Sequence, residues 1–136
     1  MTRLAIDGRH IQVRERVRAG RIVYRCAIPV PEHDGDVPVR IELLTATRPW
    51  RPRVYAQAPE CLRHRFGDGS LCMWWELDPR ARRWMPTDGL SELIHHIRRH
   101  LFQEACCRAG LSWPGEQSPG DHRRPRRCST CGGQGE

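Results

Sequence analysis

Apolar and polar residues alternate along four stretches in the first half of the chain, and this two-residue period is typical of half-buried β-strands. The stretches are residues 10–17, 21–30, 38–47 and 54–58. Arg18-Ala19-Gly20 offers a turn between the first two stretches, which therefore predict a hairpin. Residues 1–9 are weakly patterned. Because the links between the four stretches are short, the sequence predicts a four-stranded antiparallel meander.

A helical period replaces the alternation in the second half of the chain. Apolar residues recur three and four positions apart from Leu90 to Leu101, which predicts a helix with one apolar stripe. We expect Asp88 to cap its N-terminus and Gly110 to follow its C-terminus. No regular period holds over residues 59–86, and a long ordered loop of this kind usually carries function. With the helix laid on the sheet, we expect a two-layer α+β fold.

The length of 136 residues fits one domain, which we expect to span residues 1–116. Residues 117–136 are rich in Arg, Pro and Gly, so they are expected to form a tail. No apolar run approaches the roughly 20 residues of a membrane span, and residues 1–8 lack a signal-peptide core. The seven cysteines are odd in number and scattered, which favours reduced thiols. We therefore expect a cytoplasmic protein with no membrane partner.

The charge of the chain is strongly positive, with a net value of +7, and all 23 basic residues are arginine. Such a charge attracts nucleic acids, yet the arginines are spread along the chain outside the tail. An acidic protein partner explains the charge equally well, so nucleic acid is not expected as a partner. The absence of lysine fits arginine-rich codon usage. It would also spare an activated acyl group from attack by the protein's own amines, and the sequence does not separate these two explanations.

Cys72 is the candidate for covalent chemistry. It lies eight residues after His64, and Gly67-Asp68-Gly69 between them can reverse the chain without steric cost. Leu71 and Met73 flank it with apolar surface. A cysteine in this setting is either a small buried hydrophobe or a nucleophile, because the thiolate is the strongest common nucleophile at neutral pH.

The segment around Cys72 resembles the active site of a known family. Gly69-Ser70-Leu71-Cys72, with His64 upstream and Trp84-x-Pro86 downstream before an amphipathic helix, is similar to the catalytic segment of ubiquitin-conjugating enzymes. The likeness covers roughly residues 10–115 and is greatest to the bacterial members. It implies the UBC-like fold, in which an antiparallel meander packs on a C-terminal helix and carries a long active-site loop. The family usually has His-Pro-Asn where this chain has His64-Arg65-Phe66, so the asparagine that steadies the oxyanion is missing.

The resemblance also implies roles for individual residues. Cys72 would accept the C-terminal acyl group of a ubiquitin-like protein from an activating enzyme and pass it to an acceptor protein. His64 would tie the loop, and Asp88 or Asp68 would orient the acceptor amine or take its proton. Arg63 and Arg65 would supply positive potential. The reaction requires no cofactor, and the expected setting is a bacterial conjugation pathway linked to antiviral defence.

Two other interpretations of the chain stay open. A non-catalytic UBC-fold module would bind a ubiquitin-like protein without chemistry, although that class typically lacks the cysteine. A cysteine protease is less consistent with the sequence, because Cys72 and His64 lie close together and no orienting asparagine is apparent.

Further Cys and His residues suggest metal binding. Cys128 and Cys131 form a CxxC pair that can supply half of a tetrahedral zinc site. Four arginines lie beside this pair, so a small zinc- or nucleic-acid-binding protein is an alternative function. His96 and His100 are four residues apart and share a helix face, but we expect them to face solvent.

Overall fold

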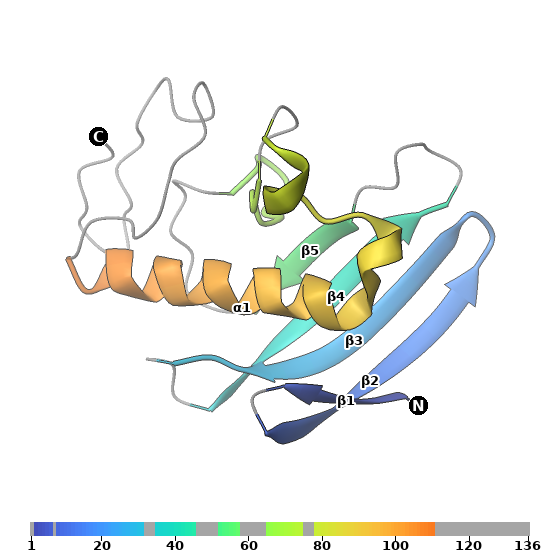
Figure 1. Cartoon of the computed structure of the whole chain (residues 1–136), viewed down its shortest axis with the longest axis horizontal. Helices are drawn as coiled ribbons and strands as arrows, with labels where there is room; N and C mark the ends of the chain where they lie inside the picture. The colour runs from blue at the N-terminus through green and yellow to red at the C-terminus, as the bar shows by residue number, and fades with distance from the viewer. Residues whose placement is uncertain are drawn as a thin grey trace.

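The described part of the chain forms a five-stranded antiparallel sheet followed by one long helix (Figure 1). The computed structural model describes residues 2–6, 8–31, 35–45, 52–57, 65–74 and 78–110. The strands are β1 (Thr2–Ile6), β2 (Arg9–Arg18), β3 (Arg21–Pro29), β4 (Asp36–Leu44) and β5 (Pro52–Ala56). Two 3₁₀ turns, η2 (Arg80–Arg82) and η3 (Pro86–Asp88), precede the helix α1 (Gly89–Arg108). The strands are neighbours in chain order, so the predicted meander and the α+β class are confirmed.

The predicted strand count of four is wrong, because residues 2–6 form a further strand, β1. Leu4 pairs with Ile11 of β2, and Ile6 is completely buried. Gly8 turns the chain between the two strands with a φ of 74°, a conformation that side chains other than glycine rarely adopt. An Asp-Gly pair before a strand is a known hairpin signal, but five residues are too few to show a period.

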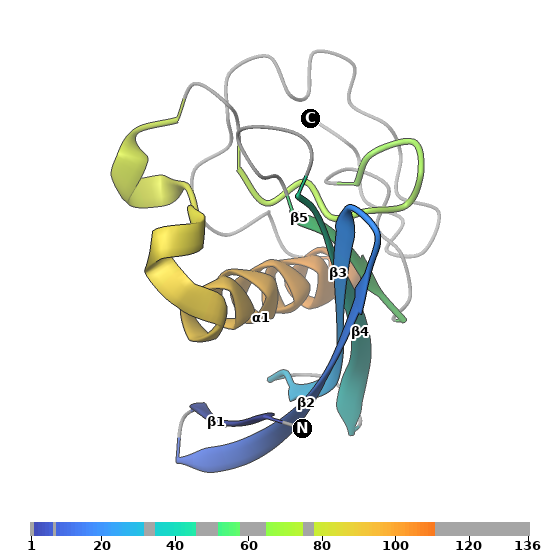
Figure 2. The same cartoon turned by 90° about the vertical axis from the view of Figure 1, so that its right-hand side faces the viewer.

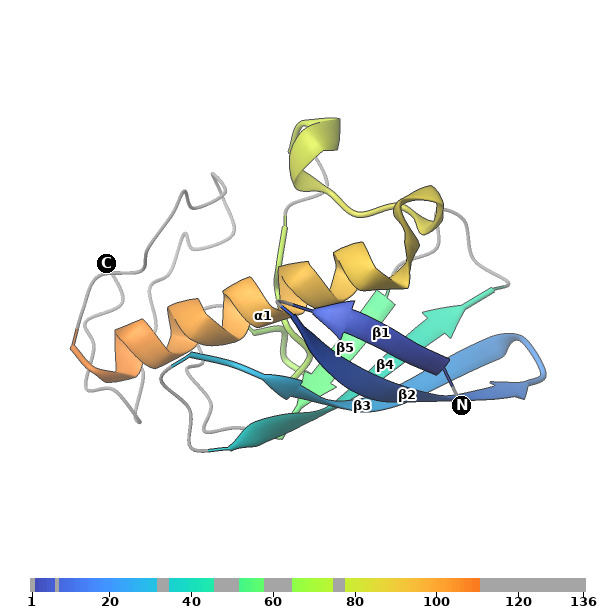
Figure 3. The ribbon, with the colours of Figure 1, turned by 60° about the horizontal axis from the view of Figure 1, so that its bottom comes forward.

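The helix lies against one face of the sheet, as the views along the sheet show (Figures 2 and 3). The alternate residues that face α1 are the apolar ones, and they form the core with the inner stripe of the helix. The fully buried members are Ile6, Ile28, Ile41, Val54, Leu93, Ile94, Ile97 and Leu101. Arg98 ties the helix to the end of β3 through a 2.6 Å hydrogen bond to the Pro29 carbonyl. No helix among the described residues is both long and apolar enough to cross a membrane.

The two ends of α1 are closed in different ways. Gly110 follows the helix with a φ of 86° and donates its N–H to the Cys107 carbonyl at 3.0 Å, which confirms its predicted place. Asp88 precedes α1 but makes no side-chain cap to it. Its carboxylate instead accepts the Met85 N–H at 2.8 Å and closes η3. Asp88 therefore occupies the predicted N-cap position of α1, but its side chain closes the 3₁₀ turn, because that turn comes between the loop and the helix.

The core makes the packing of α1 directly testable. Ile97 is fully buried in the core cluster, so Ile97→Ala removes packed atoms and leaves a cavity. We expect the free energy of unfolding, measured by urea denaturation, to fall by about 2 to 5 kcal/mol. The control is Val17→Ala, because the Val17 side chain is mostly exposed and its loss should change stability by about 0.5 kcal/mol or less. Equal effects of the two substitutions would contradict the packing described.

Candidate functional site

A tight hairpin over residues 65–71 leads into the candidate cysteine. Arg65 and Leu71 form an isolated antiparallel bridge, and Phe66 N–H donates to the Ser70 carbonyl at 2.9 Å. Gly69 takes a φ of 88° at the tip. Leu71 N–H donates to the Val54 carbonyl of β5 at 2.9 Å. The hairpin is therefore closed on itself and attached to the outer edge of the sheet.

Asp68 holds the tip of the 65–71 hairpin. Its Oδ1 accepts the Ser70 backbone N–H at 2.9 Å and the Ser70 hydroxyl at 2.6 Å. Its Oδ2 accepts the Tyr55 hydroxyl of β5 at 3.3 Å. The hydrogen bonds from Ser70 lower the pKa of the Asp68 carboxyl, with a further contribution from the Arg53 charge. Asp68 is thus an anion that serves as a structural acceptor, which makes it a weak base.

A buried ion pair fixes the start of the 65–71 hairpin to α1. The Arg65 guanidinium donates from Nε to Glu104 Oε2 at 2.8 Å and from Nη2 to Glu104 Oε1 at 2.9 Å. Its Nη1 donates to the Gly69 carbonyl at 3.2 Å. The side chains of Arg65 and Glu104 are 2% and 0% exposed. A two-point contact of this kind sets both the distance and the angle between hairpin and helix.

The positive charge of Arg65 and the negative charge of Glu104 neutralise each other in the protein interior. Burial by itself would raise the pKa of Glu104, but the hydrogen bonds from Arg65 and the nearby His100 imidazole outweigh it, and the net pKa is lowered. His100 is buried, with Nε2 3.6 Å from Glu104 Oε2, so the expectation of a solvent-facing His100 is wrong. The expected positive potential of Arg65 near Cys72 is largely neutralised, because its guanidinium is paired with a carboxylate.

Cys72 begins the segment that leaves the 65–71 hairpin. Leu71 before it is buried in the core, and Met73 and Trp74 after it pack partly against the core. Cys72 itself is half-buried, and its sulfur is not in a disulfide. Cys26 offers a contrast on β3, where burial raises the pKa of its thiol to about 11. Cys72 thus lies on an anchored loop, whereas Cys26 is a strand thiol with little thiolate at neutral pH.

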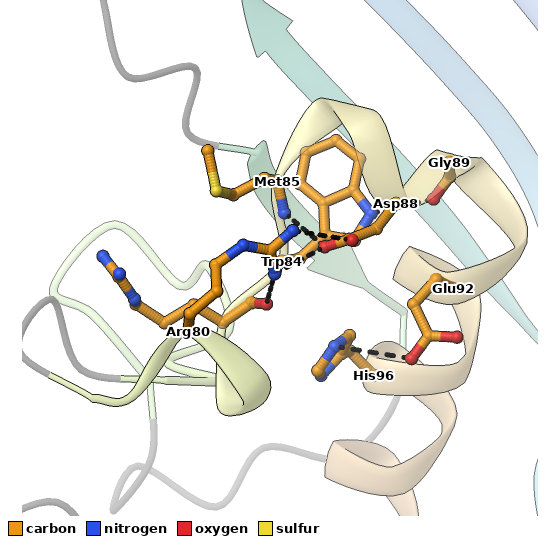
Figure 4. A network of polar contacts seen from close by, with 8 residues as sticks. Arg80, Trp84, Met85, Asp88, Gly89, Glu92 and His96 are labelled. Carbon is orange, nitrogen blue, oxygen red and sulfur yellow. Dashed lines mark hydrogen bonds and ion pairs between the residues drawn. The ribbon is translucent and has the colours of Figure 1, made fainter.

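The second predicted acid, Asp88, lies in a polar network at the start of α1 (Figure 4). Arg80 of η2 donates to its two oxygens at 2.8 and 3.1 Å. This pairing, together with the Met85 N–H, lowers the pKa of Asp88. Trp84 beside it is buried and donates its indole N–H to the Gly89 carbonyl at 2.8 Å. The network joins η2, η3 and the first turn of α1 into one unit.

Trp74, two residues after Cys72, packs against α1. Its ring meets the His96 ring edge-on, with centroids 5.5 Å apart. Burial and the Arg99 charge lower the pKa of His96, whose Nε2 lies 3.9 Å from Glu92. His96 therefore packs against the segment that follows Cys72. Among the described residues no three His, Cys, Asp or Glu side chains gather as a metal site.

Several predicted positions lie outside the described residues. They are Arg63, His64, Cys128 and Cys131. Their assigned roles therefore stay predictions. Comparisons with protein-family models, with curated proteins and with solved structures found no match for this chain.

The sequence interpretation missed Glu104. It lies three residues after Leu101, so it continues the apolar stripe of α1 with an acidic side chain. A carboxylate at a stripe position is almost never buried without a partner. The partner of Glu104 is Arg65, an arginine of the long loop. The sequence contains 23 arginines, so it does not single out this one.

The buried pair predicts a pH-dependent loss of stability. At neutral pH, Glu104→Gln should lower the free energy of unfolding by about 3 to 5 kcal/mol, because Arg65 keeps its charge without a partner. Since the pKa of Glu104 is lowered in the folded state, its contribution is present above the unfolded value of about 4.3 and is lost as pH falls through the folded value. Denaturation curves measured from pH 7 to 3 should therefore show that the difference in free energy of unfolding between the unaltered protein and Glu104→Gln becomes smaller as the pH falls.

The matched control is Glu92→Gln, which removes a half-exposed carboxylate from the same helix. We expect a change of about 0.5 kcal/mol or less for this variant. Amide exchange at Phe66 and Leu71 should accelerate in Glu104→Gln under native conditions by more than exchange at Ile41 of β4 does. If all three amides accelerate equally, the ion pair supports the whole fold and does not hold the hairpin specifically.

Proposed function

We propose that Cys72 carries the C-terminal acyl group of a ubiquitin-like protein as a thioester and transfers it to an acceptor nucleophile. The observation that carries this proposal is the setting of Cys72, a half-buried thiol on a loop anchored to both layers of the fold. The resemblance of the surrounding residues to ubiquitin-conjugating enzymes supports the choice of acyl group and the proposal of a UBC-like fold.

The proposed chemistry consists of two acyl transfers. In the first, the Cys72 thiolate attacks the thioester carbonyl on an activating enzyme, and the enzyme's thiolate leaves. In the second, an amine of the acceptor protein attacks the new thioester, the carbon–sulfur bond breaks, and an amide forms. The amine loses a proton, and Cys72 returns as a thiolate. Exchange between two thiols is nearly balanced in energy, so the protein contributes mainly orientation.

Orientation is what the described residues around Cys72 can supply. The 65–71 hairpin sets the position of the thiol, and the contact between Trp74 and His96 sets the path of the chain beyond it. Asp88 is an anion and a poor proton acceptor, and its carboxylate would have to give up the contact with Arg80 to orient the acceptor amine. The absence of lysine from the chain removes amines that would otherwise compete for the acyl group.

The test is thioester formation with purified components. The protein is incubated with a candidate ubiquitin-like protein, its activating enzyme and ATP, and the products are separated with and without thiol reductant. We expect an adduct that reductant cleaves, and Cys72→Ser should give an adduct that resists reductant, because an alkoxide is a poorer leaving group than a thiolate. Cys72→Ala should give none, and its loss of about 1 kcal/mol in transfer energy should leave the protein folded.

The matched control is Cys26→Ala, which removes a partly buried thiol from the sheet and should leave adduct formation unchanged. An adduct that persists in Cys72→Ala would show that the site is elsewhere. Binding of the ubiquitin-like protein without any adduct, in the presence of an activating enzyme already loaded with it, would favour a non-catalytic binding module.

A further inference from the structure

Arginines from three strands form a row across the sheet. The register places Arg14 of β2 opposite Arg25 of β3, and Arg25 opposite Arg40 of β4. Arg40 is opposite Tyr55 of β5, and its guanidinium lies 4.5 Å from the centre of the Tyr55 ring. Residues directly opposite each other in antiparallel strands point to the same face. Cys26, next in sequence to Arg25, packs against the core, so this row faces away from α1.

The neighbouring rows add to the charge on this outer face. Arg16 of β2 and Arg53 of β5 lie two residues along their strands from the first row, and Arg18 pairs with Arg21 at the β2–β3 turn. We call the exposed surface formed by these residues the arginine face. Its members are Arg14, Arg16, Arg18, Arg21, Arg25, Arg40 and Arg53, together with Tyr55.

Among the described residues, few acidic side chains balance the seven arginines of the arginine face, and Asp68, beside Tyr55 and Arg53, is one of them. Glu42 lies within the arginine face, 3.5 Å from Arg40 and 4.0 Å from Arg21, and is mostly covered. Asp36 lies at the far end of β4 and pairs with Arg9. Like charges directly opposite each other destabilise a sheet, so the row of three arginines has a cost in the isolated protein. An anionic ligand would remove that cost.

We propose that the arginine face binds nucleic acid through its phosphate backbone. Guanidinium groups match phosphate bidentately, and neighbouring strands hold them about 4.8 Å apart across the sheet, with about 6.8 Å between alternate residues along a strand. Tyr55 at the end of the row is half-buried, and its ring lies under the Arg40 guanidinium, on whose plane a base can stack. The register thus gathers arginines that are scattered in the sequence, where their distribution had argued against this partner.

An acidic protein fits the arginine face less well. Protein interfaces are built around a buried apolar or aromatic centre and are depleted of charge there. The large apolar residues that are exposed among the described part of the chain are Val17, Phe66 and Met85. Val17 alternates onto the opposite face of β2, and the other two lie in loops. Interfaces with nucleic acid are more polar and far more positive, which is what this face provides.

The experiment measures binding of a fluorescein-labelled single-stranded DNA of 20 nucleotides by fluorescence anisotropy at several salt concentrations. The full-length protein should bind with a Kd in the micromolar range at low salt. The variant Arg14→Gln/Arg25→Gln/Arg40→Gln should bind about 100-fold more weakly at 0.1 M salt. The slope of its plot of log K against log salt should be smaller in magnitude by about 2. Each phosphate contact to a single strand contributes about 0.7 to that slope, and the variant removes three arginines.

The matched control is Arg123→Gln/Arg124→Gln/Arg126→Gln, which lowers the net charge by the same amount in the tail. It should keep most of the affinity and most of the salt slope. The face variant should melt close to the unaltered protein, since relief of repulsion between opposed charges offsets the lost contacts of Arg40 with Glu42 and Tyr55. A loss of binding confined to the tail variant would overturn the proposal, as would equal losses in the two variants. Equally tight binding of a polyglutamate peptide would overturn it in favour of an acidic protein partner.

Discussion

The ion pair between Arg65 and Glu104 connects the two parts of the protein on which the candidate site depends. Its loss would leave the 65–71 hairpin attached to the sheet edge by the Leu71 amide and by the hydrogen bond between Tyr55 and Asp68. A buried pair gains little net stability, because each charge is first stripped of water. What it provides is geometry, since two parallel hydrogen bonds define one orientation of the hairpin and therefore one position for Cys72.

The sheet has two faces of opposite character, and each has its own role in our interpretation. The face toward α1 is apolar and holds the helix, the hairpin and the Cys72 segment in one core. The other face carries the arginine rows. The two meet at β5, where the Tyr55 hydroxyl bonds Asp68 at the tip of the hairpin. A polyanion on the arginine face would therefore lie next to the loop that carries the proposed catalytic thiol.

Local pattern was sufficient for most of the architecture. The alternation over residues 10–17 and the helical stripe from Leu90 to Leu101 are each set by whether a side chain faces water, and both appear in the structure as β2 and α1. It failed for β1, since a strand of five residues is too short to show a period. It placed Asp88 correctly before α1 but gave no sign that the Asp88 side chain closes η3, because a 3₁₀ turn before a helix leaves no periodic signal.

The sequence by itself determined the antiparallel meander, the helix that follows it and the position of Cys72 after a glycine turn in the loop between them. These depend on neighbours a few positions apart. The tertiary structure alone decided that Glu104 meets Arg65 across 39 residues, that His100 is buried and that arginines from several strands share one face. Such contacts depend on strand register and on how the helix packs, because these bring together side chains that have no fixed relation along the chain.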